Sequence, residues 1–341
     1  MTIQKYKEED YPHLNYDETY NIIDSSKLST YMSCRRKFFY EYLQGYRGIY
    51  PNKHLIYGTA LHEALEHLIL ADMPNLSDEE QQKVYMEAYK KALVIYRKDF
   101  PDAEFDAERK PKSPEYILPS LLGYYETYQD EWVTDEIIAT ELHGQVTIGE
   151  DEDGNDRLMT YRMDALRRNS VGQLYVQEHK SGGQAGSTWY DKWELAIQPL
   201  VYFHAARFNY PDDQHFGVVI NGIIAAKRAK VTLDTIKFHR VNVRYNNSMM
   251  LEGLELLNYY YGELEKDMLA VQELHPSDEA MTCFPKNPNA CTDYNTTCMF
   301  HGLCTSVRNP LRAEQRNHAP IGMKIERWNP LAEASNEVTA G

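Results

Sequence analysis

The feature that most constrains the fold is a block of strand-forming sequence with very short connections. Residues 137–148, 158–168 and 174–180 have the composition of strands. Acidic residues dominate the first connection, 149–156, and the second, 169–172, has the Asn, Ser and Gly of a turn. Connections this short join antiparallel neighbours, so the block predicts an antiparallel meander.

Helical patterns surround this block. Apolar residues recur at helical spacing in four earlier segments, and the predicted helices there cover residues 25–44, 58–70, 77–100 and 119–132. Ser25 and Ser26 are candidate N-caps of the first of these helices. After the block, the sequence predicts a helix at 190–210, strands at 215–227 and 236–245, and a long helix at 247–273. This order favours an α/β fold with a central mixed sheet flanked by helices.

Charge and hydropathy exclude some classes of protein. The chain has 36 Lys and Arg against 51 Asp and Glu, a formal net charge of −15. A protein that coats duplex nucleic acid non-specifically needs a broad basic face, whereas a nuclease with a narrow basic channel does not. The first residues contain no apolar leader, and Asn221 interrupts the longest apolar stretch, 216–226. We therefore expect a cytoplasmic protein with no membrane partner.

Two carboxylates and a lysine form the first candidate site. Side chains alternate across a strand, so Glu178 and Lys180 share one face. Asp164 lies on the preceding strand, where a short turn places it beside Glu178. Paired carboxylates need a positive charge between them, and their oxygen atoms suit Mg²⁺ or Mn²⁺. Lys180 would then orient water or stabilise charge on a phosphate, although a salt bridge at a strand end would also explain the triplet.

Two helical pairs extend this candidate site. His62 and Glu66 are four residues apart on one helix face, and His62 could complete a metal site. Gln198 and Tyr202 have the same spacing and could reach a phosphate or a base. Glu141, on the strand before Asp164, is a candidate accessory acid. Packing of a helix against the sheet is the alternative explanation for both pairs.

The cysteines indicate a second metal site. Because their number is odd and no secretory leader is visible, a disulfide framework is not expected. One cysteine is N-terminal and the others share a C-terminal segment: Cys34, Cys283, Cys291, Cys298 and Cys304. The last three lie within fourteen residues. Their wide, uneven spacing is tolerated by iron–sulfur clusters, while zinc bound with His301 as a possible fourth ligand is the alternative.

Five motifs in order resemble the PD-(D/E)XK nuclease superfamily, in its RecB/AddB-like exonuclease branch, which includes CRISPR-associated and viral exonucleases. These motifs are SSKLSTYMSCRRKFFYEY, GTALHEALEH, YRMDAL, VQEHKSGG and QPLVY. The resemblance spans residues 25–304 and implies a restriction-endonuclease-like core. It also implies roles: His62, Asp164 and Glu178 as metal ligands, Lys180 as a catalytic residue with these two carboxylates, and Gln198 and Tyr202 as substrate-binding residues.

The resemblance also implies a cofactor. Many members of this branch hold a 4Fe-4S cluster with one N-terminal and three C-terminal cysteines, which match Cys34, Cys291, Cys298 and Cys304. Such a cluster would join the N-terminal helical part to the C-terminal cysteine segment; structural Zn²⁺ is the alternative. The chain departs from the family in three places. The core triplet is Glu-His-Lys, Pro199 lies inside the glutamine–tyrosine motif, and Cys291 is far from Cys298, which makes Cys283 an alternative ligand.

These observations predict one nuclease domain with two flanking segments. The domain covers 25–307, with a helical part at 25–135, a catalytic sheet at 136–246 and a cysteine segment at 247–307; residues 1–24 and 308–341 are an irregular lead-in and a tail. We expect a metal-dependent DNA exonuclease acting on single strands or duplex ends in recombination, repair or viral and defence DNA processing. Any unwinding would require a partner, such as a helicase or recombination protein, because no phosphate-binding loop of the helicase type is present. Oligomeric state is left open. A non-catalytic scaffold that binds DNA ends or a partner is the alternative function.

Overall fold

The chain forms two compact units, each assembled from separate stretches of sequence. The computed structural model describes residues 22–275, 277–311 and 319–327. The sheet unit comprises residues 51–144 and 161–250, and the terminal unit comprises the described parts of 1–50, 145–160 and 251–341. Most of the predicted lead-in and much of the predicted tail lie outside the described residues.

The sheet unit contains the predicted central mixed sheet, which confirms the fold class. Its strands are β3 (Glu136–Glu150), β4 (Asp156–Arg168), β5 (Leu174–Gly182), β6 (His215–Ala225) and β7 (Ile236–Val243), although the end of β3 and the start of β4 belong to the terminal unit. Strand β3 pairs with β4, β4 is antiparallel to β5, β5 is parallel to β6, and β6 is antiparallel to β7. The mixed pattern follows from the connections, because only the link from β5 to β6 contains helices and can return the chain in the same direction.

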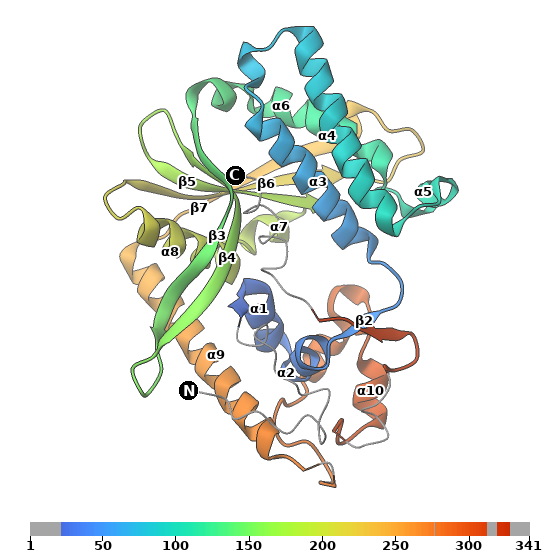
Figure 1. Ribbon diagram of the computed structural model, residues 1–341, viewed down its shortest axis with the longest axis vertical. Helices are drawn as coiled ribbons and strands as arrows, with labels where there is room; N and C mark the ends of the chain where they lie inside the picture. The colour runs from blue at the N-terminus through green and yellow to red at the C-terminus, as the bar shows by residue number, and fades with distance from the viewer. Residues whose placement is uncertain (1–21, 276, 312–318, 328–341) are drawn as a thin grey trace, which may run out of the picture. The chain divides into compact units, whose positions relative to one another are not determined.

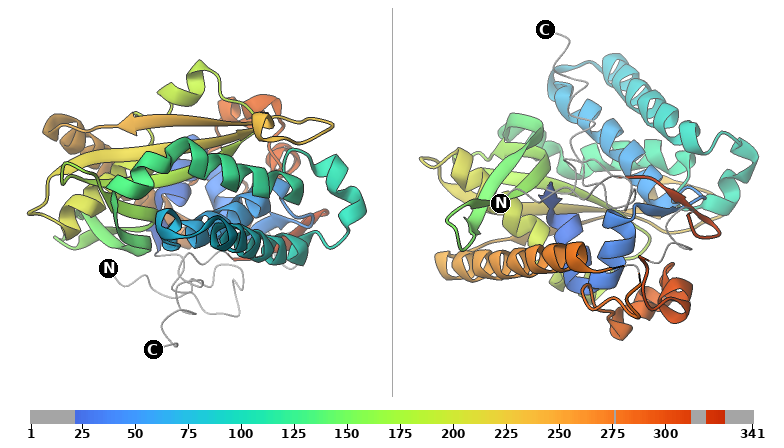
Figure 2. Two further views of the ribbon diagram at one scale, coloured as in Figure 1. Left: turned by 90° about the horizontal axis from the view of Figure 1, so that it is seen from above. Right: turned by 60° about the horizontal axis from the view of Figure 1, so that its bottom comes forward.

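Helices cover both faces of these strands. The helices of the sheet unit are α3 (Lys53–Leu70), α4 (Asp78–Asp99), α5 (Asp106–Arg109), α6 (Ile117–Thr134), α7 (Ser187–Asp191) and α8 (Ile197–Asn209). Short 3₁₀ turns lie at Met73–Asn75, Ala103–Phe105, Pro114–Tyr116 and Leu233–Thr235. Helices α3, α4 and α6 build one apolar core with Ile223, Ala225 and Ile236 of the sheet. They lie on one side of the strands (Figure 2, left).

Local sequence explains where these helices begin and end. The helix predicted from Ser77 is α4, and Ser77 and Glu80 form the reciprocal capping box that starts it. The predicted helix 190–210 is instead divided into α7 and α8, with the turn between them. Pro199 lies in the first turn of α8, where no intrahelical hydrogen bond is lost. The proline therefore fits a helix start.

The terminal unit joins segments from both ends of the chain. Its elements are β1 (Ile23–Asp24), α1 (Ser25–Ser33), α2 (Arg35–Phe38), a π-helix (Phe39–Leu43), β2 (Tyr46–Gly48), most of α9 (Asn247–Glu273), a 3₁₀ segment (Pro288–Asn295), α10 (His301–Ser306) and β8 (Met323–Ile325). Strand β1 runs parallel to the first part of β4, and β2 pairs antiparallel with β8. Figure 1 shows α9, in orange, and α10, in red, within this unit.

The first predicted helix, 25–44, is wrong as a single element. Cys34 has extended backbone angles, φ −157° and ψ 108°, and separates α1 from α2. The break frees the backbone N–H of Arg36 to donate to the carbonyl of Pro285 at 3.2 Å. The cap also differs, because Asp24, and neither Ser25 nor Ser26, accepts from the backbone N–H of Lys27 at 2.8 Å. Tertiary contacts with the C-terminal segment therefore replaced helix continuity at this point.

No helix within the described residues is long and apolar enough to cross a membrane.

Candidate active site

Asp164 and Glu178 lie side by side on the antiparallel strands β4 and β5, just beyond the paired residues. The register between these strands runs from Arg168↔Leu174 to Ala165↔Gln177. Beyond the last of these pairs, Asp164 precedes Ala165 and Glu178 follows Gln177, so the geometry of the hairpin brings the two predicted carboxylates together. His62 reaches the same place from the middle of α3, and all three side chains belong to the sheet unit.

Both oxygen atoms of Asp164 accept hydrogen bonds or ion pairs from histidines. His62 Nδ1 lies 3.0 Å from Asp164 Oδ1. The backbone N–H of His179 donates to Oδ2 at 2.6 Å, and His179 Nδ1 lies 3.1 Å from the same oxygen. Burial opposes ionisation here, yet His62 and His179 together hold the pKa of Asp164 well below its usual value. Asp164 is therefore the ionised carboxylate of the pair.

Glu178 has the opposite electrostatic environment. Its side chain is only 4% exposed, and its Oε1 accepts from Lys180 Nζ at 2.7 Å. Burial, and next the Asp164 carboxylate, raises the pKa of Glu178 to about 7. Its other oxygen, Oε2, is buried and has no hydrogen-bond partner within the part of the chain that the structure describes. A buried carboxylate oxygen without a partner is costly, and a cation would satisfy it.

Lys180 connects the carboxylates to helix α8. Its ammonium donates to Gln198 Oε1 at 2.7 Å as well as to Glu178. Gln198 Nε2 in turn donates to the Tyr202 hydroxyl at 2.9 Å. The contacts thus join Glu178, Lys180, Gln198 and Tyr202 into one group, and His62 and Asp164 into a second, and the two carboxylates influence each other through their charges. The first turn of α8 defines the position of Gln198, despite the adjacent Pro199.

Glu141 lies close enough to Asp164 for the charge of that carboxylate to change its pKa. Burial, and then the Asp164 carboxylate, raises its pKa to about 7. Its Oε2 pairs with Arg162 Nε at 3.3 Å, and its φ of +46° is rare for a residue with a side chain. Glu66, the helical neighbour of His62, accepts from the Thr140 hydroxyl at 3.2 Å. The predicted accessory acid is therefore near the site, while Glu66 contacts strand β3.

The residue arrangement fits a divalent cation in its chemistry but is not a closed metal cage. In residues 22–275, 277–311 and 319–327, no group of three or more His, Cys, Asp or Glu side chains is arranged to hold a metal ion. His62 contacts Asp164 directly. The carboxylates of Asp164 and Glu178 are nevertheless the oxygen donors that Mg²⁺ or Mn²⁺ would take, and Glu178 Oε2 has no other partner among the described residues.

His179 and Tyr124 are the residues of this site that sequence reasoning missed. His179 is the middle residue of the Glu-His-Lys triplet, and its ring contacts both Asp164 and the hydroxyl of Tyr124 on α6. Strand alternation places its side chain on the face opposite Glu178 and Lys180. A histidine at that position was the available signal. Nothing in the local sequence marked Tyr124 among the 27 tyrosines.

The predicted cluster cysteines lie in the terminal unit. Cys34 stands at the break between α1 and α2, Cys304 is in α10, and the backbone N–H of Cys298 donates to the carbonyl of Cys291 at 2.8 Å. Burial raises the pKa of Cys304, and Cys34 and Cys298 add to this rise. All five cysteines are free thiols, and Cys283 is buried.

The structure does not support the predicted metal cluster between these cysteines. Asn287 Nδ2 donates to the carbonyl of Ser33 at 2.7 Å, so the segment before Cys291 contacts the chain beside Cys34. Nonetheless, these thiols do not form a metal-holding group among the residues that the structure describes. The N-terminal and C-terminal segments are joined by hydrogen bonds and packing.

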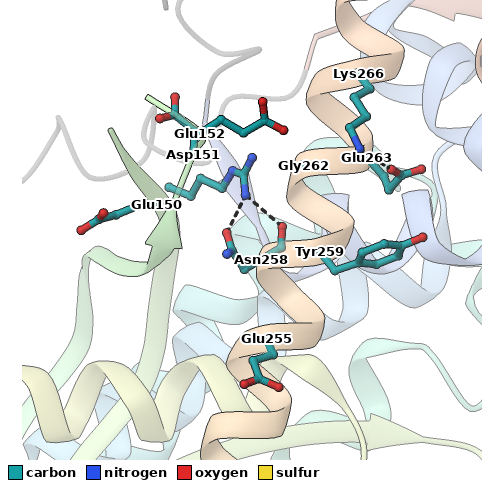
Figure 3. A pocket seen from close by; sticks show the side chains of 10 residues that line it. Glu150, Asp151, Glu152, Glu255, Asn258, Tyr259, Gly262, Glu263 and Lys266 are labelled. Carbon is teal, nitrogen blue, oxygen red and sulfur yellow. Dashed lines mark hydrogen bonds and ion pairs between the residues drawn. The ribbon is translucent and has the colours of Figure 1, made fainter. Parts of the chain in front are cut away.

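A separate cavity of about 400 Å³ is lined entirely by residues of the terminal unit. Figure 3 shows Glu150 and Glu152 on the strand side of the cavity and Asn258 on helix α9, with the Glu150 carboxylate directed away from Asn258. Arg157 donates to the side-chain and backbone oxygens of Asn258 at 2.7 and 3.3 Å. Acidic side chains predominate in the lining, which also includes Asp151, Glu255, Tyr259, Gly262, Glu263 and Lys266. This cavity is therefore distinct in composition from the carboxylate–lysine site.

Comparison with known proteins identifies the family. Residues 25–305 match the family model described as the PD-(D/E)XK nuclease superfamily. A solved structure titled "Crystal structure of SSO0001" is similar at 15% sequence identity, with a TM-score of 0.26, over 60% of this chain and 84% of that one. No curated protein matches this chain. Because the family model spans most of the sequence, the chain belongs to the PD-(D/E)XK nuclease superfamily.

Proposed function

We propose that this protein is a metal-dependent exonuclease that hydrolyses phosphodiester bonds of single-stranded DNA or DNA ends. The observation that carries the proposal is the group formed by Asp164, Glu178 and Lys180. Two buried carboxylates of opposite pKa shift stand beside one ammonium, and Glu178 Oε2 has no hydrogen-bond partner among the residues that the structure describes. Perturbed titratable groups in one place are typical of catalytic sites.

The residues divide the chemistry between them. Asp164, Glu178 and His62 would hold Mg²⁺ or Mn²⁺, which when bound supplies Lewis-acid activation of the phosphate and of water. His62 and His179 keep Asp164 ionised and fixed in orientation. Glu178 and Gln198 hold the ammonium of Lys180 between them, so its position is fixed before substrate binds. Lys180 then orients the attacking water or stabilises charge on the phosphate, and Gln198 with Tyr202 contacts the substrate.

Cleavage of end-labelled DNA tests this function. We expect label loss from linear single strands or frayed ends with Mn²⁺ or Mg²⁺, none with EDTA, and a loss of activity of at least about 100-fold in Lys180→Ala. Lys83→Ala, which removes an exposed lysine of α4, is the matched control and should retain activity. Closed circular single-stranded DNA should remain intact.

The outcomes separate the possibilities. Cutting of the circle would contradict the exonuclease mode but keep the nuclease. Equal activity in Lys180→Ala and Lys83→Ala would overturn the assignment of the site. No cleavage by folded wild-type protein with either metal would favour a scaffold that binds DNA ends.

The RecB/AddB-like branch and its 4Fe-4S cluster are a second part of the proposal. The ligands would be Cys34, Cys291, Cys298 and Cys304. Support comes from the sequence pattern, from the contact between Asn287 and the carbonyl of Ser33, and from the influence of Cys34 and Cys298 on Cys304. The cluster would stabilise the fold without taking part in hydrolysis, and zinc is the competing metal. Within this branch, a helicase or recombination partner would supply unwound DNA.

A further inference from the structure

A row of polar residues crosses the sheet behind Asp164. His179 on β5 pairs with Asn221 on β6, which pairs with Arg240 on β7. These three side chains therefore share one level of the sheet. Tyr124 of α6 packs over the row. His179 and Asn221 are 2% and 0% exposed and Tyr124 is 1% exposed, so water does not satisfy their polar atoms.

The hydroxyl of Tyr124 has three polar neighbours. Gln177 Nε2 lies 2.6 Å away, Asn221 Nδ2 lies 3.0 Å away, and His179 Nε2 lies 2.9 Å away. A phenol has one hydrogen to donate and two lone pairs that accept. Three partners saturate it only if two of them donate and one accepts.

Two arginines settle which partners donate. Arg240 Nε donates to Asn221 Oδ1 at 2.8 Å, and Arg167 donates to Gln177 Oε1 at 3.3 Å. A guanidinium can only donate, so each amide must turn its oxygen to its arginine. The NH₂ groups of Asn221 and Gln177 therefore face Tyr124 and fill both lone pairs of its oxygen.

The remaining bond has only one possible direction. Tyr124 must donate its hydroxyl hydrogen to His179 Nε2, because the described residues offer no other acceptor to this hydroxyl. If His179 carried a proton on Nε2, that proton would meet an oxygen with no free lone pair. The ring proton therefore lies on Nδ1, which is 3.1 Å from Asp164 Oδ2 and donates to it.

The two arginines are themselves fixed by Glu131 at the end of α6. Its carboxylate pairs with the guanidinium of Arg240, and its backbone carbonyl accepts from Arg167 at 3.0 Å. The guanidinium of Arg240 also lies 4.0 Å from the centre of the Tyr128 ring. The direction of the network is thus set by two arginines that Glu131 holds in place.

We propose that Tyr124 and His179 are positioning residues. Through them, Arg167 and Arg240 fix the direction of the hydrogen bond that His179 Nδ1–H donates to the Asp164 carboxylate. This relay fixes the Nδ1–H tautomer of His179 and so fixes the orientation of Asp164. A role of this relay in catalysis rests on the proposed nuclease function, whereas the tautomer of His179 does not depend on that function.

The tautomer is measured first, in the wild-type protein. Selective ¹⁵N-histidine labelling with long-range ¹H–¹⁵N spectra distinguishes protonated from bare ring nitrogens, and the signals missing in His179→Asn identify His179. We expect Nδ1 protonated and Nε2 bare. Protonation of Nε2 would overturn the relay even if the protein is an active nuclease. If the protein has the expected tautomer but cleaves no DNA, the relay stands and only the proposed nuclease function is rejected.

Activity tests whether Tyr124 acts through His179. We expect Tyr124→Phe to raise the Mn²⁺ concentration for half-maximal cleavage by about 10- to 100-fold, the usual effect of losing a group that orients a metal ligand. His179→Asn keeps an N–H near the position of Nδ1 and should retain activity, while His179→Leu should lose it. In the His179→Asn background, Tyr124→Phe should have no further effect. Equal effects of Tyr124→Phe in both backgrounds, or equal losses in His179→Asn and His179→Leu, would show a merely structural role and overturn the proposal. Thermal melts confirm that each variant is folded.

Discussion

At the scale of single residues, the two carboxylates of the site differ because their partners differ. Asp164 receives hydrogen bonds from two histidines and stays ionised despite burial. Glu178 has one ammonium on one oxygen and nothing on the other within the described residues. Its pKa of about 7 is the result of burial and of the charge on Asp164. The same chemistry at two adjacent positions thus gives one fixed anion and one group that a cation would stabilise.

Glu178→Gln tests this difference through stability. A carboxyl whose pKa is higher in the folded state stabilises the fold below its unfolded value and loses that contribution as pH rises through the folded value. Without metal, Glu178→Gln should therefore raise the free energy of unfolding by on the order of 1–3 kcal/mol at about pH 8, and much less at about pH 5. Urea denaturation in EDTA measures both. Adding Mn²⁺ should raise the melting temperature of the wild type more than that of the variant.

Equal stability of Glu178→Gln and wild type at the higher pH would show that Glu178 is not a buried anion beside Asp164. Equal stabilisation of both proteins by Mn²⁺ would show that the metal binds elsewhere.

At the scale of elements, the approach of α6 to the sheet decides how Tyr124 reaches the polar row. Gly123, the residue before Tyr124, lies against the ring of Phe238 on β7. A Cβ at this position would come within 2.7 Å of that ring. The absence of a side chain therefore allows helix and strand to pack closely. This contact, and not helix propensity, is the reason for a glycine inside α6.

Gly123→Ala should lower the stability of the protein although alanine is the better helix former. The helix gains about 1 kcal/mol, but overpacking in a dense core costs about 1–3 kcal/mol, so we expect a net loss of about 1 kcal/mol. Gly58→Ala in α3 is the matched control, because its Cβ would meet only the Ser181 hydroxyl at 4.0 Å. It should gain about 0.5–1 kcal/mol. Urea midpoints compare the two, and a gain in both variants would contradict the packing argument.

At the scale of the whole molecule, the terminal unit holds together segments more than 200 residues apart in sequence. Asp267 on α9 accepts from the Tyr31 hydroxyl at 2.7 Å, from Arg35 at 3.3 Å and from the backbone N–H of Phe284 at 3.1 Å. The side chain of Arg36 donates to the carbonyl of Phe284 at 2.9 Å. These contacts join the N-terminal helices to the cysteine segment.

The proposed cluster predicts which cysteine matters for metal content. Anaerobically purified wild type should contain iron and acid-labile sulfide, and Cys34→Ser and Cys304→Ser should lose both. Cys283→Ser is the matched control and should keep them, because Cys283 is a buried thiol whose pKa is raised to about 11 by burial. Zinc in place of iron would contradict the 4Fe-4S assignment. Loss of iron in Cys283→Ser would show that Cys283 is one of the ligands.

Local sequence was sufficient for much of the fold. Periodicity predicted the boundaries of α9 and the start of α4, and strand composition predicted the hairpin of β4 and β5. The break at Cys34 was not predictable, because it depends on a contact with Pro285. Likewise, α7 and α8 were predicted as one helix, although Pro199 fits the start of a separate helix at α8.

The sequence by itself determined which side chains could meet at the site. Alternation along a strand put Glu178 and Lys180 on one face, a short hairpin brought Asp164 alongside, and helical spacing paired Gln198 with Tyr202. Only the tertiary structure decided how these groups are held. The saturation of the Tyr124 hydroxyl, on helix α6, depends on Gln177 and His179 of β5 and Asn221 of β6. Hydrogen-bond direction is a property of the assembled network, because each donor is fixed only when all of its neighbours are in place.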